Sequence, residues 1–330
     1  MLKKIHDQSD CAIYAIDDQV ETTIERYILS TPESRAICND PMVMGLNYTR
    51  KLQKACASFF KGIAAAEMLA LQERQSLIFN ILRGGLNFSL REALADAYDW
   101  NMHGSAFISA QRRRVEGNSE EWEITEDGYK KVYFPANAQV VVGDVVATGT
   151  SLKHGLECMI DEAKQQQVGL KNIVFFTFGG PKTEEVMAAI DAECKATFPE
   201  YEKTVVCYIE GRFAIATPET PLSIKLTGTD LLRRDSLLAP EFLASQMENP
   251  AFPLERCTIY DAGSRAFNVP EYVEDVMDYW QQVVALAKET SYQALLTERC
   301  PDMDAADFGQ VDLLTVAQQQ VDKLKALGLH

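Results

Sequence analysis

The sequence predicts an α/β fold with a parallel, doubly wound sheet and helical additions at both ends. Through the middle of the chain, short apolar runs alternate with helical patterns, and small-residue turns follow several of these runs. Strands that alternate with helices form parallel sheets, which bind ligands in the crevice at the carboxyl ends of their strands. The glycine-rich turns fall at such strand ends, so they are the first candidates for a binding site.

Composition narrows the class of protein before any motif is considered. The chain has 330 residues, a formal net charge of −16 at pH 7 and 47% hydrophobic residues, which is enough to bury a sizeable core. This acidity argues against nucleic-acid binding, because phosphate backbones are bound by basic surfaces. No apolar run approaches the roughly 18 residues of a membrane-spanning helix. We therefore expect no binding to nucleic acids or membranes.

The N-terminus and the cysteines lead us to expect a cytoplasmic location. The chain turns charged at Lys3 and Lys4 and lacks the apolar centre of a signal peptide. The eight cysteines are scattered singly, without a CxxC pair or a Cys/His cluster. This spacing argues against a disulfide scaffold and against a structural zinc site. The thiols are expected to be reduced, several of them in the core.

The first part of the chain, 1–75, is expected to be mainly helical. Apolar side chains recur at helical spacing from Tyr48 to Leu71. A short apolar run at 76–82 then predicts a buried strand, which leads through Arg83-Gly84-Gly85-Leu86 into a helix from about residue 87. This is the first unit of strand, glycine turn and helix.

An arginine run follows the next predicted strand. The strand is expected at 106–110, and Arg112 to Arg114 form the densest basic run in the chain. From 115 to 134 polar and apolar residues alternate around Asp127-Gly128, a turn signal for a hairpin. A long polar hairpin can act as a mobile lid, whereas a charge run can also be an ordinary solvated surface.

The stretch from Val140 to Leu152 is the centre of the predicted site. A β-branched strand leads to Asp144, and a turn of small residues from Ala147 to Ser151 opens a helix. The first N–H groups of a helix have no intrahelical partner, so they attract phosphate. Hydroxyls add donors there, and a glycine lets the backbone approach closely. Taken alone, the stretch could also be an ordinary connection between a strand and a helix.

Two more strands, at 172–178 and 205–209, complete the predicted sheet. The segment 213–256 contains five prolines and is interpreted as an irregular insertion. Amphipathic spacing returns at 269–330, which is expected to be a helical C-terminal extension. The α/β domain would then span 76–268.

Four segments resemble motifs of the type I phosphoribosyltransferase family, and most closely those of its uracil-specific members. Gly143 to Ser151 is similar to the motif for phosphoribosyl pyrophosphate, and Leu82 to Leu86 is similar to the pyrophosphate loop. The arginine hairpin from Ile108 to Phe134 resembles the flexible loop that closes over the substrate. Asp261 to Phe267 resembles the base-binding element of the uracil enzymes. The four segments follow the order of the family over 76–268.

The resemblance implies a reaction and its substrates. A phosphoribosyl group would move from phosphoribosyl pyrophosphate to a pyrimidine-like or other heterocyclic base, with release of pyrophosphate. Mg²⁺ would bind together with phosphoribosyl pyrophosphate, without a direct protein ligand and with Asp144 acting through water. The helical additions at both ends lead us to expect a homodimer.

The resemblance also implies a role for each matching residue. The catalytic residues would be Asp144, which binds the ribose hydroxyls, and Arg83 and Arg112, which neutralise the pyrophosphate. The substrate-binding residues would be Gly84, Gly85 and Arg113 at the pyrophosphate, Ala147, Thr148, Gly149, Thr150 and Ser151 at the 5′-phosphate, and Asp261, Ala262, Gly263 and Arg265 at the base.

Two residues depart from the family pattern. Many of these enzymes carry the first of two adjacent acids where Gly143 stands, and a lost charge-assisted hydrogen bond costs roughly 1.5–3 kcal/mol. Ser264 replaces an acid of the base-binding element, so the base need not be uracil. The alternative function is therefore a non-catalytic or regulatory protein that binds phosphoribosyl pyrophosphate or a nucleotide on the same fold. A gain of turnover in Gly143→Asp would indicate an enzyme that has lost one acid.

Overall fold

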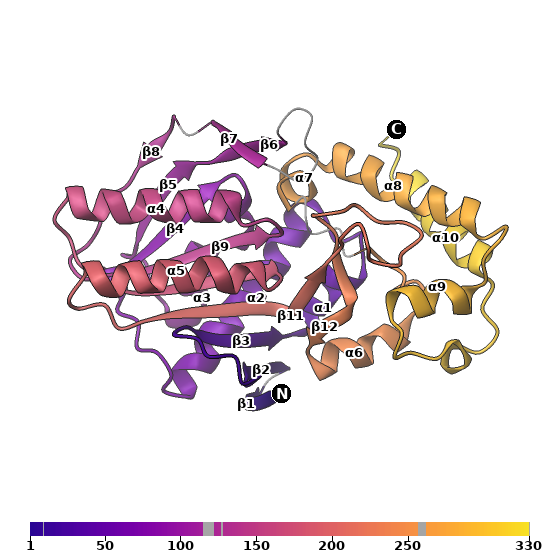
Figure 1. Ribbon diagram of the computed structural model, residues 1–330, viewed down its shortest axis with the longest axis horizontal. Coiled ribbons are helices and arrows are strands. Elements are labelled where there is room, and N and C mark those ends of the chain that lie inside the picture. Colours follow the sequence, from indigo (N-terminus) through magenta and orange to yellow (C-terminus); the bar gives the residue numbers. More distant parts are fainter. Residues whose placement is uncertain (9, 115–121, 127, 257–261, 330) are drawn as a thin grey trace.

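One large sheet organises the molecule (Figure 1). The computed structural model describes residues 1–8, 10–114, 122–126, 128–256 and 262–329, with the backbone alone at 111–114, 122–126 and 262. Ten strands of these residues form the sheet, in the order β1 (Leu2–Gln8), β2 (Cys11–Ile16), β3 (Glu25–Ser30), β11 (Lys203–Ile215), β10 (Leu170–Gly179), β9 (Ala138–Val146), β4 (Ser76–Leu82), β5 (Gly104–Ser109) and β8 (Lys130–Lys131), while β12 (Leu231–Leu238) pairs with β11 outside this path.

The middle of the sheet is parallel and its margins are antiparallel. Strands β3, β11, β10, β9, β4 and β5 all run in the same direction, whereas β1, β2, β8 and β12 pair antiparallel with their neighbours. Parallel strands are covered on both faces, so their sequences are continuously apolar rather than alternating. Val140, Val141 and Val142 of β9 are accordingly 0% exposed. The predicted parallel, doubly wound sheet is confirmed.

Helices cover both faces of this sheet. In Figure 1, α4 (Thr150–Gln165) and α5 (Lys182–Thr197) lie in front of it. The helices α1 (Pro32–Asn39), α2 (Gly45–Ala65) and α3 (Leu90–Tyr98) lie behind it. The rings of Phe59 and Phe60 on α2 each pack edge-on against Phe176 of β10, with centroids 5.1 Å apart. Such aromatic contacts attach the rear helical layer to the centre of the sheet.

The C-terminal part of the chain lies beyond the carboxyl ends of the strands (Figure 1). Its hydrophobic side chains form a second buried cluster around Tyr279 and Trp280. The elements of this part are α6 (Pro240–Ser245), η3 (Gln246–Glu248), α7 (Ala262–Phe267), α8 (Val269–Leu286), α9 (Tyr292–Arg299), η4 (Ala305–Phe308) and α10 (Leu313–Lys325).

The secondary structure predicted for two segments, 1–75 and 213–256, is wrong. The segment 1–75 is not mainly helical, because it begins with β1, β2 and β3 before the helices. Strand β3 is buried between two neighbours, so it lacks the alternation that marks a half-exposed strand. The segment 213–256 is not irregular throughout, because it contains the end of β11, all of β12 and α6. Its prolines lie outside these strands, and Pro240 occupies the first turn of α6.

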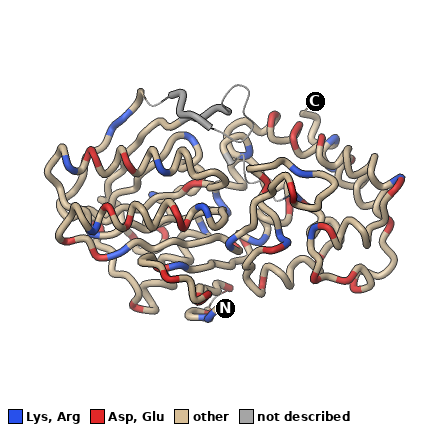
Figure 2. Tube along the Cα trace, in the orientation of Figure 1, with Lys and Arg blue, Asp and Glu red and all other residues tan. Residues whose placement is uncertain are grey.

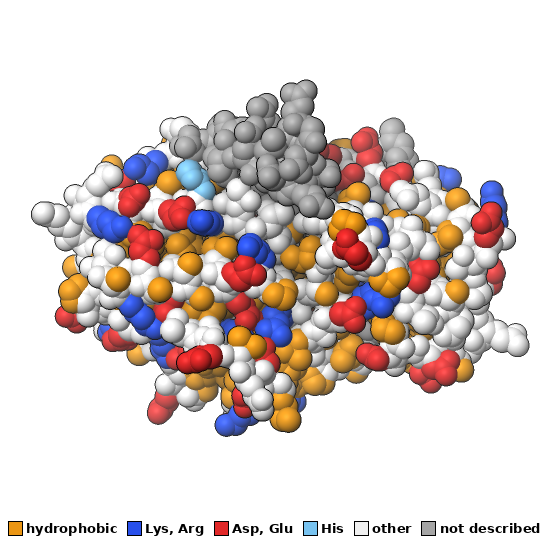
Figure 3. Space-filling model, viewed as in Figure 1, with side chains coloured by type: hydrophobic (Ala, Val, Ile, Leu, Met, Phe, Trp, Pro, Cys, Tyr) orange, Lys and Arg blue, Asp and Glu red, His pale blue; other side chains and the backbone are white. Residues whose placement is uncertain are grey.

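Acidic and basic side chains are interspersed on the face shown in Figure 3 and along α4 and α5 in Figure 2. Among the described residues, no helix combines the length and the apolar character that crossing a membrane requires.

A buried carboxyl group lies where β11 approaches the start of α1. Glu210 is 0% exposed and has a φ of +63°. Its Oε1 accepts hydrogen bonds from the backbone N–H of Thr31, at 3.2 Å, and from the hydroxyl of Ser34. Its Oε2 has no hydrogen-bond partner among the described residues. Burial raises the pKa of Glu210 to about 7, although these hydrogen bonds oppose the rise.

We expect the free energy of unfolding of the wild type to fall, relative to that of Glu210→Gln, as the pH rises. The folded-state pKa of about 7 exceeds the ordinary 4.5, so the stability from proton binding is complete below pH 4.5 and is lost as the pH passes 7. The full difference is roughly 3 kcal/mol. Denaturant titrations of both proteins between pH 5 and pH 8 measure it, with the exposed Glu289→Gln as control. If the difference in unfolding free energy between the wild type and Glu210→Gln does not change with pH, the expectation is contradicted.

Candidate functional site

The turn after β9 has the geometry of an anion-binding loop. Gly149 has a φ of +77° and caps α4, a conformation that favours glycine. A Cβ at this position would lie 3.0 Å from Cγ2 of Val186, so a side chain would also be crowded. The hydroxyls of Thr148 and Thr150 are 3.3 Å apart. Helix α4 begins at Thr150, so its first N–H groups, which lack intrahelical partners, lie beside these hydroxyls.

A second glycine turn lies directly against the end of β9. The turn is η2 (Gly84–Phe88), which follows a cis peptide bond between Leu82 and Arg83. A Cβ at Gly84 would lie 2.9 Å from Oδ1 of Asp144, and one at Gly85 would lie 3.1 Å from the carbonyl oxygen of Gly143. Side chains at both positions would push the two loops apart. The glycines therefore allow the close contact between the ends of β4 and β9.

Asp144 lies at the junction of the two turns. Its carboxylate is half-buried, and Oδ1 accepts a hydrogen bond from the backbone N–H of Val145 at 2.9 Å. Arg83, one residue before Gly84, is exposed. Asp144, Arg83 and the N-terminus of α4 thus all follow the carboxyl ends of β4 and β9. This combination can bind a phosphate group and a hydroxylated ligand at the same time.

Gly143 has a packing role that the sequence did not indicate. A Cβ at this position would lie 2.5 Å from Cγ of Phe88, a side chain that is 0% exposed. The ring of Phe88 packs near that of Phe178, with centroids 6.3 Å apart. The space beside Gly143 is therefore filled by an aromatic ring that anchors η2 to the sheet. Residue spacing alone could not identify Phe88, because its partner lies 55 positions later.

The predicted arginine hairpin is present, but its two strands pair earlier in the chain than the sequence predicted. Strands β6 (Gln111–Arg114) and β7 (Trp122–Glu126) pair antiparallel, with Arg112 opposite Ile124 and Arg113 opposite Glu123. Both strands precede Gly128 in the chain, so their pairing does not span the predicted turn, and Asp127 lies outside the described residues. The hairpin lies beside α4 (Figure 1). The side chains of Arg112 and Arg113 lie outside the described residues.

The predicted base-binding element lies next to the same site, but Arg265 has another function. Helix α7 packs against η2 and α2, which brings Gly263 to this edge. Asp261 lies outside the described residues, as does the side chain of Ala262. Arg265 is 1% exposed, so it does not line a base pocket.

The guanidinium of Arg265 instead joins α7 to the loop between α1 and α2. Its Nε donates to the carbonyl oxygen of Val43 at 2.7 Å, and its Nη2 donates to the carbonyl oxygens of Ile37 and Asp40, each at 3.0 Å. The group also lies 5.0 and 5.3 Å from the ring centroids of Tyr48 and Tyr272. This set of partners uses the charge of Arg265 within the protein.

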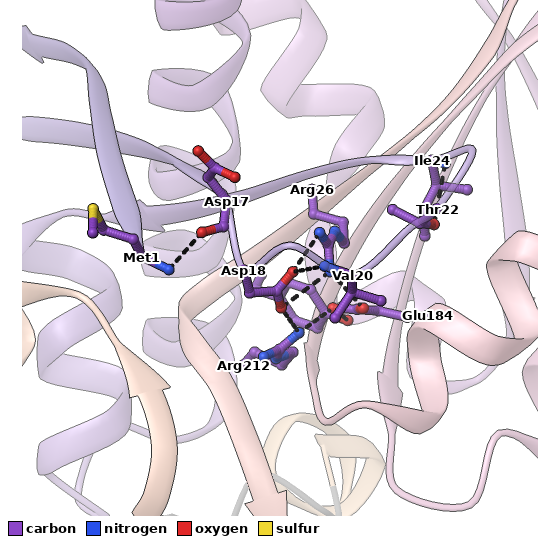
Figure 4. Close-up of polar contacts among 10 residues, drawn as sticks. Met1, Asp17, Asp18, Val20, Thr22, Ile24, Arg26, Glu184 and Arg212 are labelled. Carbon is purple, nitrogen blue, oxygen red and sulfur yellow. Dashed lines mark hydrogen bonds and ion pairs between the residues drawn. The ribbon is translucent and has the colours of Figure 1, made fainter.

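A charge network holds the start of α5 to the sheet (Figure 4). Arg26 pairs with Asp18 at 2.7 Å and with Glu184 at 2.9 Å, and Arg212 contacts the same two carboxylates at 2.8 and 2.9 Å. Burial alone would raise the pKa of Asp18, but hydrogen bonds from both arginines hold it at about 2. Two cations match two anions, so the network is structural. Sequence reasoning missed it because Asp18 and Glu184 are far apart in the chain.

Comparison with known proteins finds only distant structural likeness. No family model matches the sequence, and no curated protein matches it. A hypoxanthine-guanine phosphoribosyltransferase from Bacillus anthracis shares 16% identity over 42% of this chain and 73% of its own, with a TM-score of 0.26. A hypoxanthine phosphoribosyltransferase from Staphylococcus aureus shares 14% identity over 60% and 91%, with a TM-score of 0.28.

An adenine phosphoribosyltransferase from Trypanosoma brucei shares 12% identity over 59% of this chain and 86% of its own. That structure was solved in complex with AMP, pyrophosphate and ribose-5-phosphate. Its TM-score is 0.33. These identities and TM-scores are too low to indicate a function.

Proposed function

We propose that this chain is a phosphoribosyltransferase, which moves a phosphoribosyl group from phosphoribosyl pyrophosphate to a heterocyclic base and releases pyrophosphate. The observation that carries the proposal is the contact between the Gly84 turn and Asp144, beside the N-terminus of α4. A ligand that holds a phosphate, a ribose and a pyrophosphate in one molecule matches these three neighbouring features. The resemblance of the four sequence motifs supports the same substrate.

Each part of the site would have a distinct task. The backbone N–H groups and hydroxyls from Thr148 to Ser151 would bind the 5′-phosphate, and Asp144 would accept hydrogen bonds from ribose hydroxyls. The amides of Gly84 and Gly85, with Arg83, Arg112 and Arg113, would neutralise the pyrophosphate. Mg²⁺ bound with the substrate would supply further positive charge there, and a half-buried carboxylate beside a glycine suits an ion held through water.

The site would then accelerate the reaction by positioning the substrates and by stabilising the charges that develop. A ring nitrogen of the base attacks C1 of the ribose while the bond from C1 to the pyrophosphate oxygen breaks. Positive charge develops on the ribose and negative charge on the leaving group, so fixed amides and guanidinium groups lower the barrier. No protein nucleophile is required. The base would bind near Gly263 and the backbone of Ala262, and we propose a pyrimidine-like ring for it.

Release of pyrophosphate tests the proposal. Purified protein with Mg²⁺ and phosphoribosyl pyrophosphate is assayed against a panel of purine, pyrimidine and other heterocyclic bases. We expect base-dependent release of pyrophosphate and formation of one nucleoside monophosphate. Circular dichroism and cooperative unfolding confirm that the protein is folded. Folded protein without release in the presence of any base would refute transferase activity.

A non-catalytic protein that binds phosphoribosyl pyrophosphate or a nucleotide is the second candidate. The packing of Phe88 against Gly143 favours it, because the ribose would meet a single carboxylate. Calorimetry with phosphoribosyl pyrophosphate and nucleoside monophosphates separates the candidates. Binding without turnover supports the second candidate, whereas absence of any binding contradicts both.

A further inference from the structure

Buried arginine side chains gather where the C-terminal part of the chain meets β12. Arg233 of β12 is 6% exposed, and Arg299, the last residue of α9, is 5% exposed. Helix α9 packs against β12 (Figure 1), and both arginines line the same cavity between these elements. A buried cation is costly unless hydrogen bonds and opposite charge compensate it. The partners of the two arginines therefore decide whether their charges are compensated.

Neutral groups hold the guanidinium of Arg233. Its Nε donates a hydrogen bond to Oε1 of Gln246 at 2.7 Å. Its Nη1 donates to the carbonyl oxygen of Glu255, and its Nη2 donates to the carbonyl oxygen of Cys38 at 3.0 Å. These bonds satisfy the donors and fix the position of the group. They leave its positive charge without a direct anionic partner, because all three acceptors are neutral.

Arg299 has an unsatisfied donor in addition to its charge. Its Nη2 donates to the carbonyl oxygen of Ile224 at 3.0 Å, and the guanidinium lies 5.0 Å from the ring centroid of Tyr279. Its Nε is buried and has no hydrogen-bond partner among the described residues. Buried donors in native proteins are generally satisfied by a protein group, a water or an ion. The Nε–H of Arg299 therefore indicates an acceptor inside the cavity.

The cavity has the size of a single small particle. Its volume is about 10 Å³, which holds one water-sized particle but no polyatomic anion. Among the described residues, three arginines, one acid and four apolar residues line it; the charged ones are Arg233, Arg234, Arg299 and Glu255. Arg234 already pairs with the exposed Asp235 at 3.2 Å. The lining is therefore apolar and basic, with Arg233 and Arg299 as its buried cations.

The buried acids near the cavity have other partners. Glu255 accepts a hydrogen bond from the backbone N–H of Arg256 through Oε1 and one from Nε1 of Trp280 through Oε2, each at 3.1 Å. Asp230 forms an ion pair with the guanidinium of Arg256 at 3.2 Å. Around the cavity, the two buried cations of the lining thus face the one negative charge of Glu255. A single monovalent anion would balance these charges.

We propose that this cavity binds one halide ion, with chloride as the ordinary occupant, held by the Nε–H of Arg299 and the positive charge of Arg233. The ion accepts the hydrogen bond that Nε otherwise lacks, and its charge balances the buried excess. Guanidinium groups are weakly hydrated and therefore suit buried contacts with anions. Because it lies between α9 and β12, the ion stabilises the attachment of the C-terminal part to the sheet. This inference does not depend on the proposed function.

Bromide locates the site, because it replaces chloride and can be identified by its anomalous X-ray scattering. Crystals of the wild type, of Arg299→Lys and of the exposed control Arg91→Lys are grown without halide and soaked in sodium bromide. Arg299→Lys keeps the positive charge but removes the Nε–H. We expect a peak within hydrogen-bond distance of Nε of Arg299 in the wild type, the same peak in Arg91→Lys and none in Arg299→Lys. A wild-type cavity without bromide would overturn the proposal.

Thermal unfolding measures the binding in solution. Sodium chloride is compared with sodium gluconate at equal ionic strength, since gluconate is too large for the cavity. We expect chloride to raise the Tm of the wild type and of Arg91→Lys by about 2–4 °C and to leave that of Arg299→Lys unchanged. An equal shift in Arg299→Lys would overturn the proposal. A bromide peak without any shift in the wild type would show binding at crystal concentration only and would also overturn it. If Arg299→Lys does not fold, the bromide map and the chloride shift of the wild type still decide the proposal.

Discussion

Replacement of Asp144 by asparagine is expected to lower phosphoribosyl transfer by about 10- to 100-fold. Asp144 is the carboxylate that the structure places beside the Gly84 turn, and asparagine removes its charge while it keeps its shape. Charge-assisted hydrogen bonds to ribose hydroxyls would be lost. The backbone N–H of Val145 can still donate to the amide oxygen, so the free energy of unfolding should change little.

Release of pyrophosphate and calorimetric affinity for phosphoribosyl pyrophosphate measure the effect of Asp144→Asn. Asp161→Asn is the matched control, since Asp161 lies exposed on α4, away from the helix N-terminus. The control is expected to behave as the wild type. Equal rates for Asp144→Asn and the wild type would show that Asp144 does not contact the reacting ligand.

Gly143→Asp is expected to lower the free energy of unfolding by about 2–4 kcal/mol and to give no gain in transfer. The structure thus changes the expectation that this substitution could restore a lost acid. The new Cβ would lie 2.5 Å from Cγ of Phe88, which has no free space to move into because it is fully buried. The carboxylate would enter an apolar contact rather than the ribose site.

Three variants separate the steric effect from the charge. Gly143→Ala introduces the Cβ alone, Gly143→Asp combined with Phe88→Ala provides space for the acid, and Phe88→Ala alone supplies the second single change. We expect Gly143→Ala to be destabilised, and we expect the double variant to be more stable than the sum of its single changes predicts. Denaturant unfolding and release of pyrophosphate are measured for each. Raised transfer in Gly143→Asp at unchanged stability would contradict this account of Phe88.

The centre of the fold could be predicted because its signals are local. Strands β4 and β9 are continuous apolar runs that end in glycine turns, and the turns themselves indicate where the helices begin. The rule that parallel strands expose their carboxyl ends at one edge places both turns on the same side of the sheet, whereas the contact between Gly84 and Asp144 is seen only in the structure. In these segments the residue types determine the local backbone conformation without help from distant parts of the chain.

Features that depend on distant partners could not be predicted. Arg265 fits the pattern of a base-binding element, yet carbonyl oxygens more than 200 positions earlier bind its guanidinium group. Phe88 is an ordinary apolar residue until the sheet brings Gly143 against it. Strand β3 (Glu25–Ser30) was not predicted because one of its two neighbours, β11, lies about 180 residues later in the chain. In each case tertiary contacts decided between conformations that the local sequence allowed.

The position of β3 also determines the order in which the protein can assemble. Glu25 of β3 pairs with Val205 of β11, so about 180 residues separate the partners, and closing such a loop is entropically costly. During synthesis, β3 emerges long before β11, so its parallel partner does not exist until β11 has left the ribosome. Until then, β3 keeps an unpaired edge, and the charged strand β1, with Lys3 and Lys4, forms the opposite edge of the ribbon of β1, β2 and β3, where its charges disfavour pairing with other chains. The local pairs of β1, β2 and β3 can therefore form early, whereas the pair of β3 and β11 forms late.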